Sequence, residues 1–349
     1  MKRDVKIFSG KHSKVLAERI CNKYDNGTLN NLKLLRFSDN EFITDIKETV
    51  RGYNVFVVQS CQSSAESIWE SMLISDALKR ASSKSIVGVF AYLPYSRQDK
   101  KGNPREPIGS KLLADVLQTS GYTRIVTIDL HADQIQGFYN IPVDHLSASY
   151  VFVPYIKQLN LNNLVFASPD SGGGKRTEKF ASIFNTDFVM CYKHRNAPNE
   201  ISHMRLIGDV TGKDVIIIDD LIDTAGTICK AADLMMEKGA NSVRAMVTHP
   251  VLSGSAYENI EKSKLLELIT TDTIPLKEKS NKITVCSVAD MLAHAIKNIN
   301  ENESISSTFD IKNDKIMVCD TDQRVDELLI NHVDVENSMP IMSDIEQAL

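Results

Sequence analysis

Short β-rich runs alternate with amphipathic windows along most of the chain, and this alternation limits the fold more than any other feature. The runs with strand character are Val5–Ser9, Val55–Gln59, Ser85–Phe90, Arg124–Asp129, Leu164–Ser168, Val215–Asp219 and Ser242–Thr248. The windows with helical periodicity are Ala65–Lys79, Ser110–Gln118, Gly174–Ile183 and Thr227–Lys238. Strands that alternate with helices favour mainly parallel sheets flanked by helices. We therefore expect an α/β protein.

The length of 349 residues suggests two domains of ordinary size. We expect a boundary near Ser147–Tyr155, where Pro154 interrupts the pattern. This predicts an α/β domain over residues 1–150 and a second one over 151–309. Residues 310–349 form an acidic extension of unknown role, with a weak strand pattern at Lys315–Cys319 and an amphipathic piece at Arg324–Ile330.

Overall charge and hydrophobicity exclude several classes of protein. The net charge is −5, which argues against a nucleic-acid binder that works by bulk charge. No apolar stretch approaches the roughly 20 residues that a membrane helix needs, and the N-terminus lacks a signal-peptide pattern. The six cysteines form no CxxC pair, and several lie inside apolar runs, as reduced thiols of cytosolic proteins usually do. We expect a cytoplasmic protein whose anion-binding sites are local.

The segment 215–227 carries the strongest motif. An apolar run delivers Asp219 and Asp220 to the carboxyl end of a strand, where parallel sheets bind ligands. Asp223, Thr224, Ala225, Gly226 and Thr227 then lead into a helix. Backbone N–H groups at a helix start, with hydroxyls and a glycine nearby, suit a phosphomonoester. The paired aspartates can accept hydrogen bonds from the hydroxyls of a sugar held by that phosphate. Alone, such a pair would more often cap a turn.

A second motif is basic. Residues 97–105 contain four cations, Arg97, Lys100, Lys101 and Arg105, interrupted by Gly102 and Pro104. The plain interpretation is a solvated loop. A mobile basic loop can also close over a triphosphate and neutralise charge that develops in a transition state.

Both motifs resemble those of known families. Residues 219–227 resemble the phosphoribosyl pyrophosphate (PRPP) loop of the type I phosphoribosyltransferase fold, which transferases and pyrophosphokinases share. Residues 95–108, Tyr-Ser-Arg-Gln-Asp-Lys-Lys through Arg-Glu-Pro-Ile, resemble the flexible loop of ribose-phosphate pyrophosphokinases. The resemblance to that family runs from Lys6 to about Phe309. It implies two phosphoribosyltransferase-like domains and Mg-dependent transfer of the pyrophosphoryl group of ATP to ribose 5-phosphate, giving PRPP and AMP.

The resemblance also implies roles for individual residues. Phe37, Asp39 and Glu41 match the segment that recognises adenine, and ATP contacts fall on Arg97, Gln98, Asp99 and Arg105. Lys100, Lys101, Lys193 and Arg195 match the residues that stabilise the transition state. Asp219, Asp220 and residues 223–227 match the residues that bind ribose 5-phosphate. His131 and Asp170, the latter in Ser168-Pro-Asp-Ser-Gly-Gly, match the Mg²⁺ ligands; because Mg²⁺ prefers oxygen, Asp170 is the better direct ligand.

Two other functions are alternatives. A catalytically silent regulatory relative tends to lose the flexible loop, whereas all its cations are present here. A phosphoribosyltransferase needs neither the Phe37–Glu41 nor the Arg97–Arg105 segment. The family also implies a homo-oligomer of dimers, commonly a hexamer. A phosphate and ADP allosteric site would match Thr49, Arg51, Arg80, Ala81, Ser82, Ser304, Ser306 and Phe309, although the segment near Phe309 departs from the family pattern.

Overall fold

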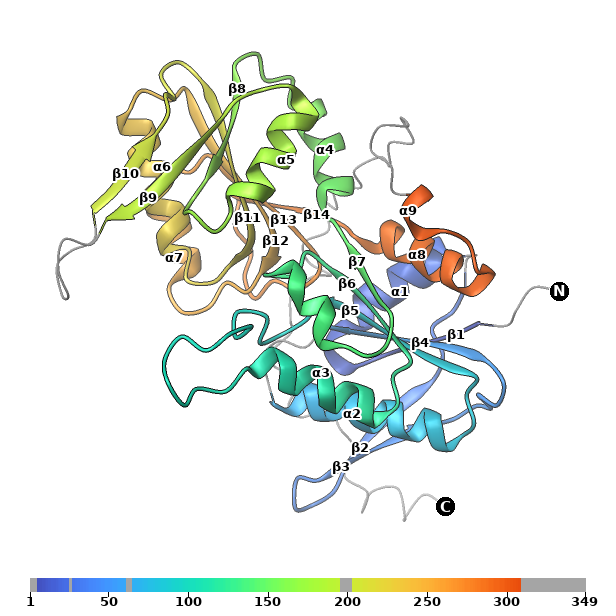
Figure 1. Cartoon of the computed structure of the whole chain (residues 1–349). Helices are drawn as coiled ribbons and strands as arrows, with labels where there is room; N and C mark the ends of the chain where they lie inside the picture. Colours follow the sequence, from blue (N-terminus) through green and yellow to red (C-terminus); the bar gives the residue numbers. More distant parts are fainter. Residues whose placement is uncertain (1–4, 25–26, 61–64, 195–202, 309–349) are drawn as a thin grey trace. The chain divides into compact units, whose positions relative to one another are not determined.

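The computed structural model describes residues 5–24, 27–60, 65–194 and 203–308. Contacts divide this part of the chain into two compact units (Figure 1). Unit 1 contains the described residues of 1–147 together with 289–308, and unit 2 contains 148–288 less the gap at 195–202. Each unit has its own sheet and its own core.

The main sheet of unit 1 is parallel. Its strands lie in the order β1, β4, β5, β6 and β7, with the bounds β1 Val5–Ser9, β4 Asn54–Ser60, β5 Ser85–Tyr92, β6 Arg124–Ile128 and β7 Val143–Leu146. β2 (Leu32–Arg36) and β3 (Phe42–Ile46) form a separate antiparallel ribbon. The inner strands are almost continuously apolar and buried, as expected of parallel strands that are covered on both faces.

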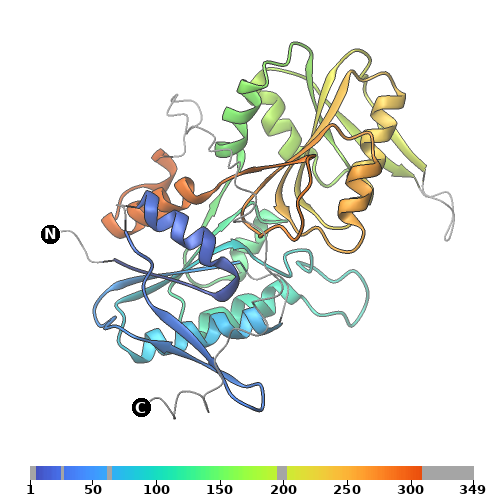
Figure 2. The ribbon, with the colours of Figure 1, turned by 180° about the vertical axis from the view of Figure 1, so that it is seen from behind.

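Helices cover both faces of this sheet. α2 (Ala65–Arg80) and α3 (Gly109–Ser120) pack on one face, where Ile74, Leu78 and Leu117 join the core. α1 (Lys14–Lys23) and α8 (Ala289–Glu301) lie side by side on the other face, with the short α9 (Ile305–Thr308) after α8 (Figure 2). Asn300 of α8 accepts a hydrogen bond from Asn54 of β4 at 2.9 Å. The last described helices thus belong to unit 1.

The sheet of unit 2 has the order β10, β9, β8, β11, β12, β13 and β14 within the described residues. The bounds are β8 Leu164–Ser168, β9 Phe188–His194, β10 His203–Ile207, β11 Asp214–Ile222, β12 Ser242–Pro250, β13 Glu267–Thr271 and β14 Ile283–Cys286. All neighbours are parallel except β9 and β10. β11 lies between β8 and β12, so its carboxyl end is at the middle of the sheet edge.

The core of unit 2 forms around β11. Val215 and Ile217 pack with α6 (Gly226–Glu237) and α7 (Ala256–Lys262). On the other face, Phe166 of β8 packs against Phe180 and Phe184 of α5 (Gly174–Phe184), with ring centroids 5.8 and 5.5 Å apart. α6 ends where Gly239 takes a φ of 88°, the left-handed conformation that favours glycine after a helix.

The expected α/β class and the strands and helices predicted above are all present, with small changes of bounds. Two expectations differ from the structure. α4 (Ser149–Gln158) continues through Pro154, whose ring is buried, at the loss of one backbone hydrogen bond. Residues 289–308 join unit 1, although 151–309 were expected to form one domain. The patterns at 315–319 and 324–330 lie outside the described residues.

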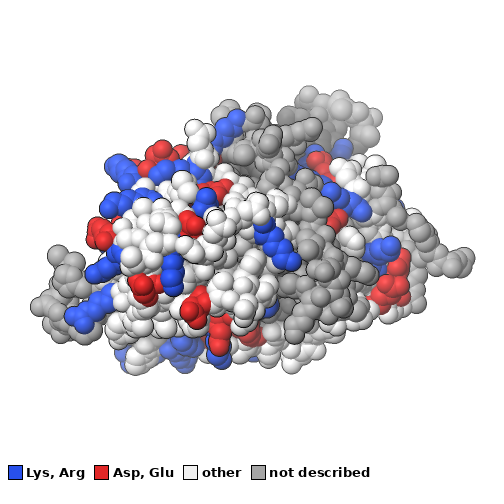
Figure 3. Space-filling model, turned by 90° about the horizontal axis from the view of Figure 1, so that it is seen from above, with Lys and Arg blue, Asp and Glu red and all other residues white. Residues whose placement is uncertain are grey.

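Surface charge is mixed on the face seen in Figure 3, where Lys and Arg side chains lie among Asp and Glu side chains. None of the helices in the described part of the chain is long and apolar enough to cross a membrane.

Candidate active site

The carboxylate pair of unit 2 lies near the carboxyl end of β11. Asp219 still pairs in register with Val247 of β12, so the strand holds the backbone of the pair in a regular ladder. Asp220 is buried, with 4% of its surface exposed, and its backbone N–H donates to Asp219 Oδ1 at 2.9 Å. Two adjacent acidic groups are therefore fixed at the central strand of the sheet.

Arg176 compensates this buried negative charge. Its Nη1 donates to Asp220 Oδ1 at 2.9 Å and lies 4.0 Å from Asp219 Oδ1. Burial, followed by repulsion from Asp220, raises the pKa of the Asp219 carboxyl well above its usual range, and Arg176 opposes that rise. A buried charge is tolerated when it is paired and hydrogen-bonded. The three side chains thus act as one electrostatic unit.

The loop after β11 turns sharply into α6. Ala225 has a φ of 63°, so a non-glycine residue adopts the left-handed conformation at the N-cap. The first turn of α6 contains no acidic residue, so no neighbouring carboxylate there competes for its N–H groups. Thr224 is exposed, and Gly226 and Thr227 begin the helix. This arrangement suits an anion such as a phosphomonoester.

Residues that follow β12 hold this loop. The Ser253 hydroxyl donates to Asp223 Oδ1, and Ser253 N–H donates to the Asp223 carbonyl at 3.1 Å. Asn259 of α7 donates its amide to the Thr224 carbonyl at 2.9 Å. The conformation of the loop is therefore set from outside the loop itself.

A glycine turn follows β8. Asp170 Oδ1 accepts the backbone N–H groups of Gly172 at 2.8 Å and Gly173 at 3.3 Å. A Cβ at Gly173 would lie 2.7 Å from Ser168 Oγ, so the close approach requires glycine. One oxygen of Asp170 thus shapes the turn. Oδ2 makes no hydrogen bond with the described residues.

In unit 1, His131 is exposed just beyond the carboxyl end of β6. Asp129 has a φ of 36°, and the N–H of Leu130 donates to His145 Nε2 at 2.9 Å. Within the described ranges there is no group of three His, Cys, Asp or Glu side chains that could hold a metal ion. His131 and Asp170 belong to different units, so their predicted pairing remains a prediction.

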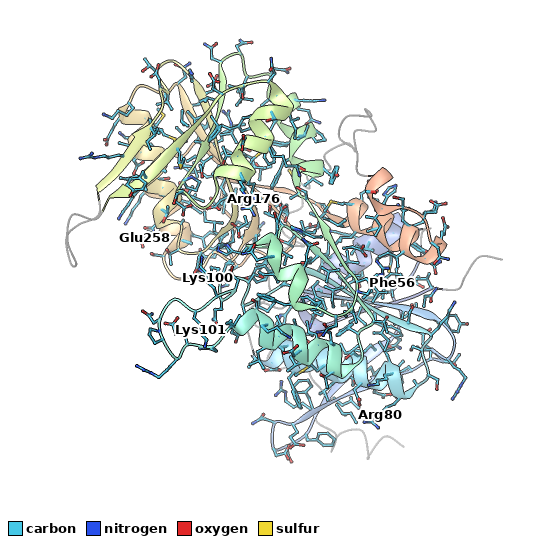
Figure 4. All side chains as sticks on the ribbon, in the orientation of Figure 1. Phe56, Arg80, Lys100, Lys101, Arg176 and Glu258 are labelled. Carbon is cyan, nitrogen blue, oxygen red and sulfur yellow. The ribbon has the colours of Figure 1, made fainter. Side chains whose placement is uncertain are left out.

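The basic loop of unit 1 connects β5 to α3. Its two ends are tied by hydrogen bonds from the N–H and hydroxyl of Ser110 to the Gln98 carbonyl, both at 3.3 Å. Asp99 accepts from Gln134 of the 3-10 helix Asp133–Phe138 at 3.2 Å. Lys100 and Lys101 extend from this loop (Figure 4). They are exposed and, like Arg105, form no ion pair with a described residue, whereas Arg97 does have a partner.

Glu106 shapes the tip of the basic loop. It accepts the N–H groups of Gly102 and Asn103, each at 2.8 Å, and the Asn103 amide at 2.6 Å. These hydrogen bonds, that of the Asn103 side chain first, lower the pKa of the Glu106 carboxyl. The acidic side chain is occupied by the loop backbone and not by the neighbouring cations.

The predicted adenine segment forms the turn between β2 and β3. Phe37 is half-buried, whereas Asp39 and Glu41 are exposed. Phe37 N–H donates to the Glu41 carbonyl at 2.7 Å, and Asp39 Oδ1 accepts the N–H of Glu41 at 3.0 Å. One carboxylate oxygen of Asp39 therefore shapes the turn, and Glu41 presents its side chain to solvent.

The remaining predicted residues are only partly described. Lys193 lies in β9, in register with Met204 of β10, and Arg195 lies outside the described residues.

Part of the predicted allosteric set comes together in unit 1. Arg51 Nη1 donates to Ser82 Oγ at 3.2 Å. The hydroxyls of Ser304 and Ser306 lie 3.0 Å apart. Thr49 is exposed, Arg80 pairs with Asp76, and Ala81 lies beside Ser82, while Phe309 lies outside the described residues.

Four residues of interest carried no assigned role in the sequence. Arg176 follows the glycine turn. The only sign of its role in the sequence is that a cation stands in the first turn of the predicted helix. Ser253 follows the strand pattern at Ser242–Thr248 and was given no role. Asn259 shows no local signal, because its partner is a backbone carbonyl. Glu106 lies in the Arg-Glu-Pro-Ile motif, which marked the basic loop but gave this residue no role.

Comparison with known proteins agrees with this geometry. A family model described as the N-terminal domain of ribose phosphate pyrophosphokinase matches residues 5–121, and one described as the phosphoribosyl synthetase-associated domain matches 175–310. The ribose-phosphate pyrophosphokinase of Porphyromonas gingivalis is 48% identical over 304 residues, covering 87% of this chain and 97% of the relative. That of Wolinella succinogenes is 49% identical over 308 residues, covering 88% and 99%.

The same likeness holds in three dimensions. The crystal structure of phosphoribosylpyrophosphate synthetase from Mycobacterium smegmatis superposes with a TM-score of 0.81 at 37% identity, covering 86% of this chain and all of that one. Both family models end by residue 310, so the acidic extension lies outside them. The expected resemblance is confirmed: this chain belongs to the ribose-phosphate pyrophosphokinase family of enzymes.

Proposed function

We propose that this enzyme transfers the pyrophosphoryl group of ATP to the anomeric hydroxyl of ribose 5-phosphate, giving PRPP and AMP for nucleotide biosynthesis. The main support is the site on β11 and α6, where a buried carboxylate pair precedes a loop suited to a phosphomonoester. A sugar phosphate offers both features at once: an anion for the helix start and hydroxyl donors for carboxylates. Membership of the family supports the same reaction.

In this proposal, unit 2 binds ribose 5-phosphate. Asp223, Thr224, Ala225, Gly226 and Thr227 would hold the 5-phosphate through backbone N–H groups and hydroxyls. Asp219 and Asp220 would accept hydrogen bonds from the ribose hydroxyls. The supports from Ser253 and Asn259 keep the loop in this conformation before the substrate arrives, which reduces the ordering cost of binding.

Unit 1 would bind ATP. Phe37 would stack on the adenine, with Asp39 and Glu41 accepting from its amino group, and Arg97, Gln98, Asp99 and Arg105 would contact the nucleotide. Lys100 and Lys101, with Lys193 and Arg195 of unit 2, would meet the charge that grows on the transferring group. Pyrophosphoryl transfer needs positioning and charge stabilisation more than covalent help. The exposure of Lys100 and Lys101 leaves them available for such a contact.

We propose Mg²⁺ as the metal, with Asp170 and His131 as its protein ligands. Magnesium is usually bound through one or two carboxylates together with substrate phosphates and waters. Such a site does not require three protein ligands, and Asp170 retains an oxygen that the glycine turn does not use. When bound, Mg²⁺ supplies neutralisation of phosphate oxygens. The carboxylate oxygens of Asp170 suit direct coordination of Mg²⁺ better than the imidazole of His131 does.

We further propose a cytoplasmic homo-oligomer built from dimers, as a hexamer. The proposal of a reducing compartment is supported by the described cysteines Cys21, Cys191, Cys229 and Cys286, which are buried free thiols. Control by phosphate and ADP is supported by the hydrogen bond between Arg51 and Ser82, because both residues belong to the predicted allosteric site. Activity that stays unchanged across a phosphate titration would count against such control.

Phosphorus NMR of purified enzyme with Mg²⁺, ATP and ribose 5-phosphate tests the reaction. The expected result is AMP in step with a new sugar-linked diphosphate. Release of ADP would replace the proposal with simple kinase chemistry. Binding of nucleotide without turnover would favour a silent regulatory relative, and consumption of added PRPP with a base would favour a phosphoribosyltransferase.

A further inference from the structure

We propose that Arg176 is a positioning residue of the ribose site, which holds the Asp220 carboxylate so that the aspartate pair meets the sugar hydroxyls in a fixed geometry. This inference rests on the proposed binding of ribose 5-phosphate to Asp219 and Asp220. Arg176 lies in the first turn of α5 (Figure 4). Because β8 and β11 are adjacent and parallel, the helix that follows β8 begins beside the carboxyl end of β11.

The alternation of side chains along β11 explains why Asp220 needs this partner. Val215 and Ile217 face the core under α6, so Asp219 continues that face and Asp220 leaves the strand toward α5. The guanidinium reaches Asp220 Oδ1 at 2.9 Å and Asp219 Oδ1 at 4.0 Å. The guanidinium therefore bridges the two carboxylates from a neighbouring element.

Charge gives the second reason. The side chain of Asp220 is 6% exposed and that of Arg176 22%, so the pair is largely removed from water. Adjacent carboxylates in such a place favour uptake of a proton, and the pKa of Asp219 is raised by burial and by Asp220. Arg176 opposes this rise, so its loss would shift the pair further toward the protonated form. An ionised pair accepts more strongly from sugar hydroxyls than a protonated one.

A purely structural role is the alternative, in which Arg176 only ties α5 to β11. The two roles differ in what they predict. A tie between elements affects thermal unfolding and both substrates alike. A positioning residue affects ribose 5-phosphate selectively, and does so more strongly at lower pH, where the pair would protonate first.

The test measures the dissociation constants of ribose 5-phosphate and ATP by calorimetry for wild type, Arg176→Met and Arg176→Lys, with Lys179→Met as the control. Lys179 is exposed one turn further along α5, so its replacement removes the same charge from the same helix. We expect Arg176→Met to weaken ribose 5-phosphate binding about tenfold or more, as loss of a charge-assisted contact does. ATP should bind within a factor of two of wild type. Arg176→Lys should recover part of the loss.

Two further measurements sharpen the result. The pH below which ribose 5-phosphate affinity declines should rise in Arg176→Met and stay in place in Lys179→Met. In the Asp220→Asn background, the Arg176 substitution should cost much less than in wild type, because the partner is already neutral. If Arg176→Met does not fold, Arg176→Gln replaces it with the same expectation.

Distinct outcomes separate this inference from the proposed function. Wild type that neither binds ribose 5-phosphate nor forms PRPP refutes the proposed function. Wild type that does both, beside an Arg176→Met enzyme of equal ribose 5-phosphate affinity, overturns the inference alone. Equal losses for ATP and ribose 5-phosphate, or additive effects with Asp220→Asn, also overturn it.

Discussion

Ser253 offers the clearest test of how the phosphate loop is held in place. Its hydroxyl donates to the Asp223 carboxylate from the segment that follows the neighbouring strand β12, 30 residues along the chain. Two backbone hydrogen bonds run beside it, Leu252 N–H to the Ile222 carbonyl and Ser253 N–H to the Asp223 carbonyl, each at 3.1 Å. Ser253→Ala removes the hydroxyl and leaves both backbone bonds, so the chain should keep its path.

The magnitude follows from the chemistry of the lost bond. A hydrogen bond to a charged group contributes about 1.5–3 kcal/mol, and Asp223 is half-buried, so water replaces part of it. We take the lower end, which corresponds to roughly tenfold in an equilibrium constant. Ribose 5-phosphate should therefore bind up to about tenfold more weakly, whereas the KM for ATP should change little and the midpoint of thermal unfolding should fall by only a few degrees.

Calorimetric titration of ribose 5-phosphate, beside steady-state formation of PRPP, measures this effect. Ser280→Ala is the control, because the Ser280 hydroxyl also takes part in a hydrogen bond of unit 2, accepting from the N–H of Lys282 at a turn before β14. Ser253→Thr, which restores a hydroxyl, should recover much of the affinity. Ribose 5-phosphate affinity within twofold of wild type in Ser253→Ala would refute the role of this contact in organising the loop.

Three further predictions follow from the charges of the site. The raised pKa of Asp219 means that the folded state favours the protonated carboxyl, so the free energy of unfolding should fall as the pH rises above about 4. Asp219→Asn should flatten this fall. An equal dependence of stability on pH in the variant and in wild type would contradict the prediction. Replacing Lys100 and Lys101 by alanine should lower kcat about 10²-fold without changing the melting temperature, beside a Lys84→Ala control; a loss under threefold would remove their role. Chelation of divalent metal should stop PRPP formation and added Mg²⁺ should restore it, whereas turnover that persists in chelator would exclude the metal requirement.

Local signals in the sequence predicted the elements well. Leu164–Ser168 is a strand with the bounds expected, and Gly239 ends α6 in the left-handed conformation expected of a glycine at that position. The family resemblance, drawn from residues 95–108 and 219–227, is confirmed by the comparisons. These features depend on neighbours a few residues apart, or on motifs contiguous in the chain, so a single sequence contains them.

Contacts between distant segments could not be predicted in this way. Arg176 and Asp220 are 44 residues apart, and Asn259 reaches the Thr224 carbonyl across 35. Nothing near Asn259 in sequence marks it, because its partner is a backbone carbonyl. Pairing of this kind depends on which strands are adjacent in the sheet, which local periodicity does not determine.

The sequence alone thus determined the α/β class, the positions of the elements, the carboxylate pair with its phosphate loop, and the family. The tertiary structure decided the strand orders, the return of α8 to unit 1, and the side chains that hold the loop and the aspartates. The physical reason is the range of the forces involved. Backbone propensity and amphipathic periodicity act within a few residues. Burial of α8 against α1, and of Asp220 beside Arg176, instead requires surfaces that exist only after the sheets have formed.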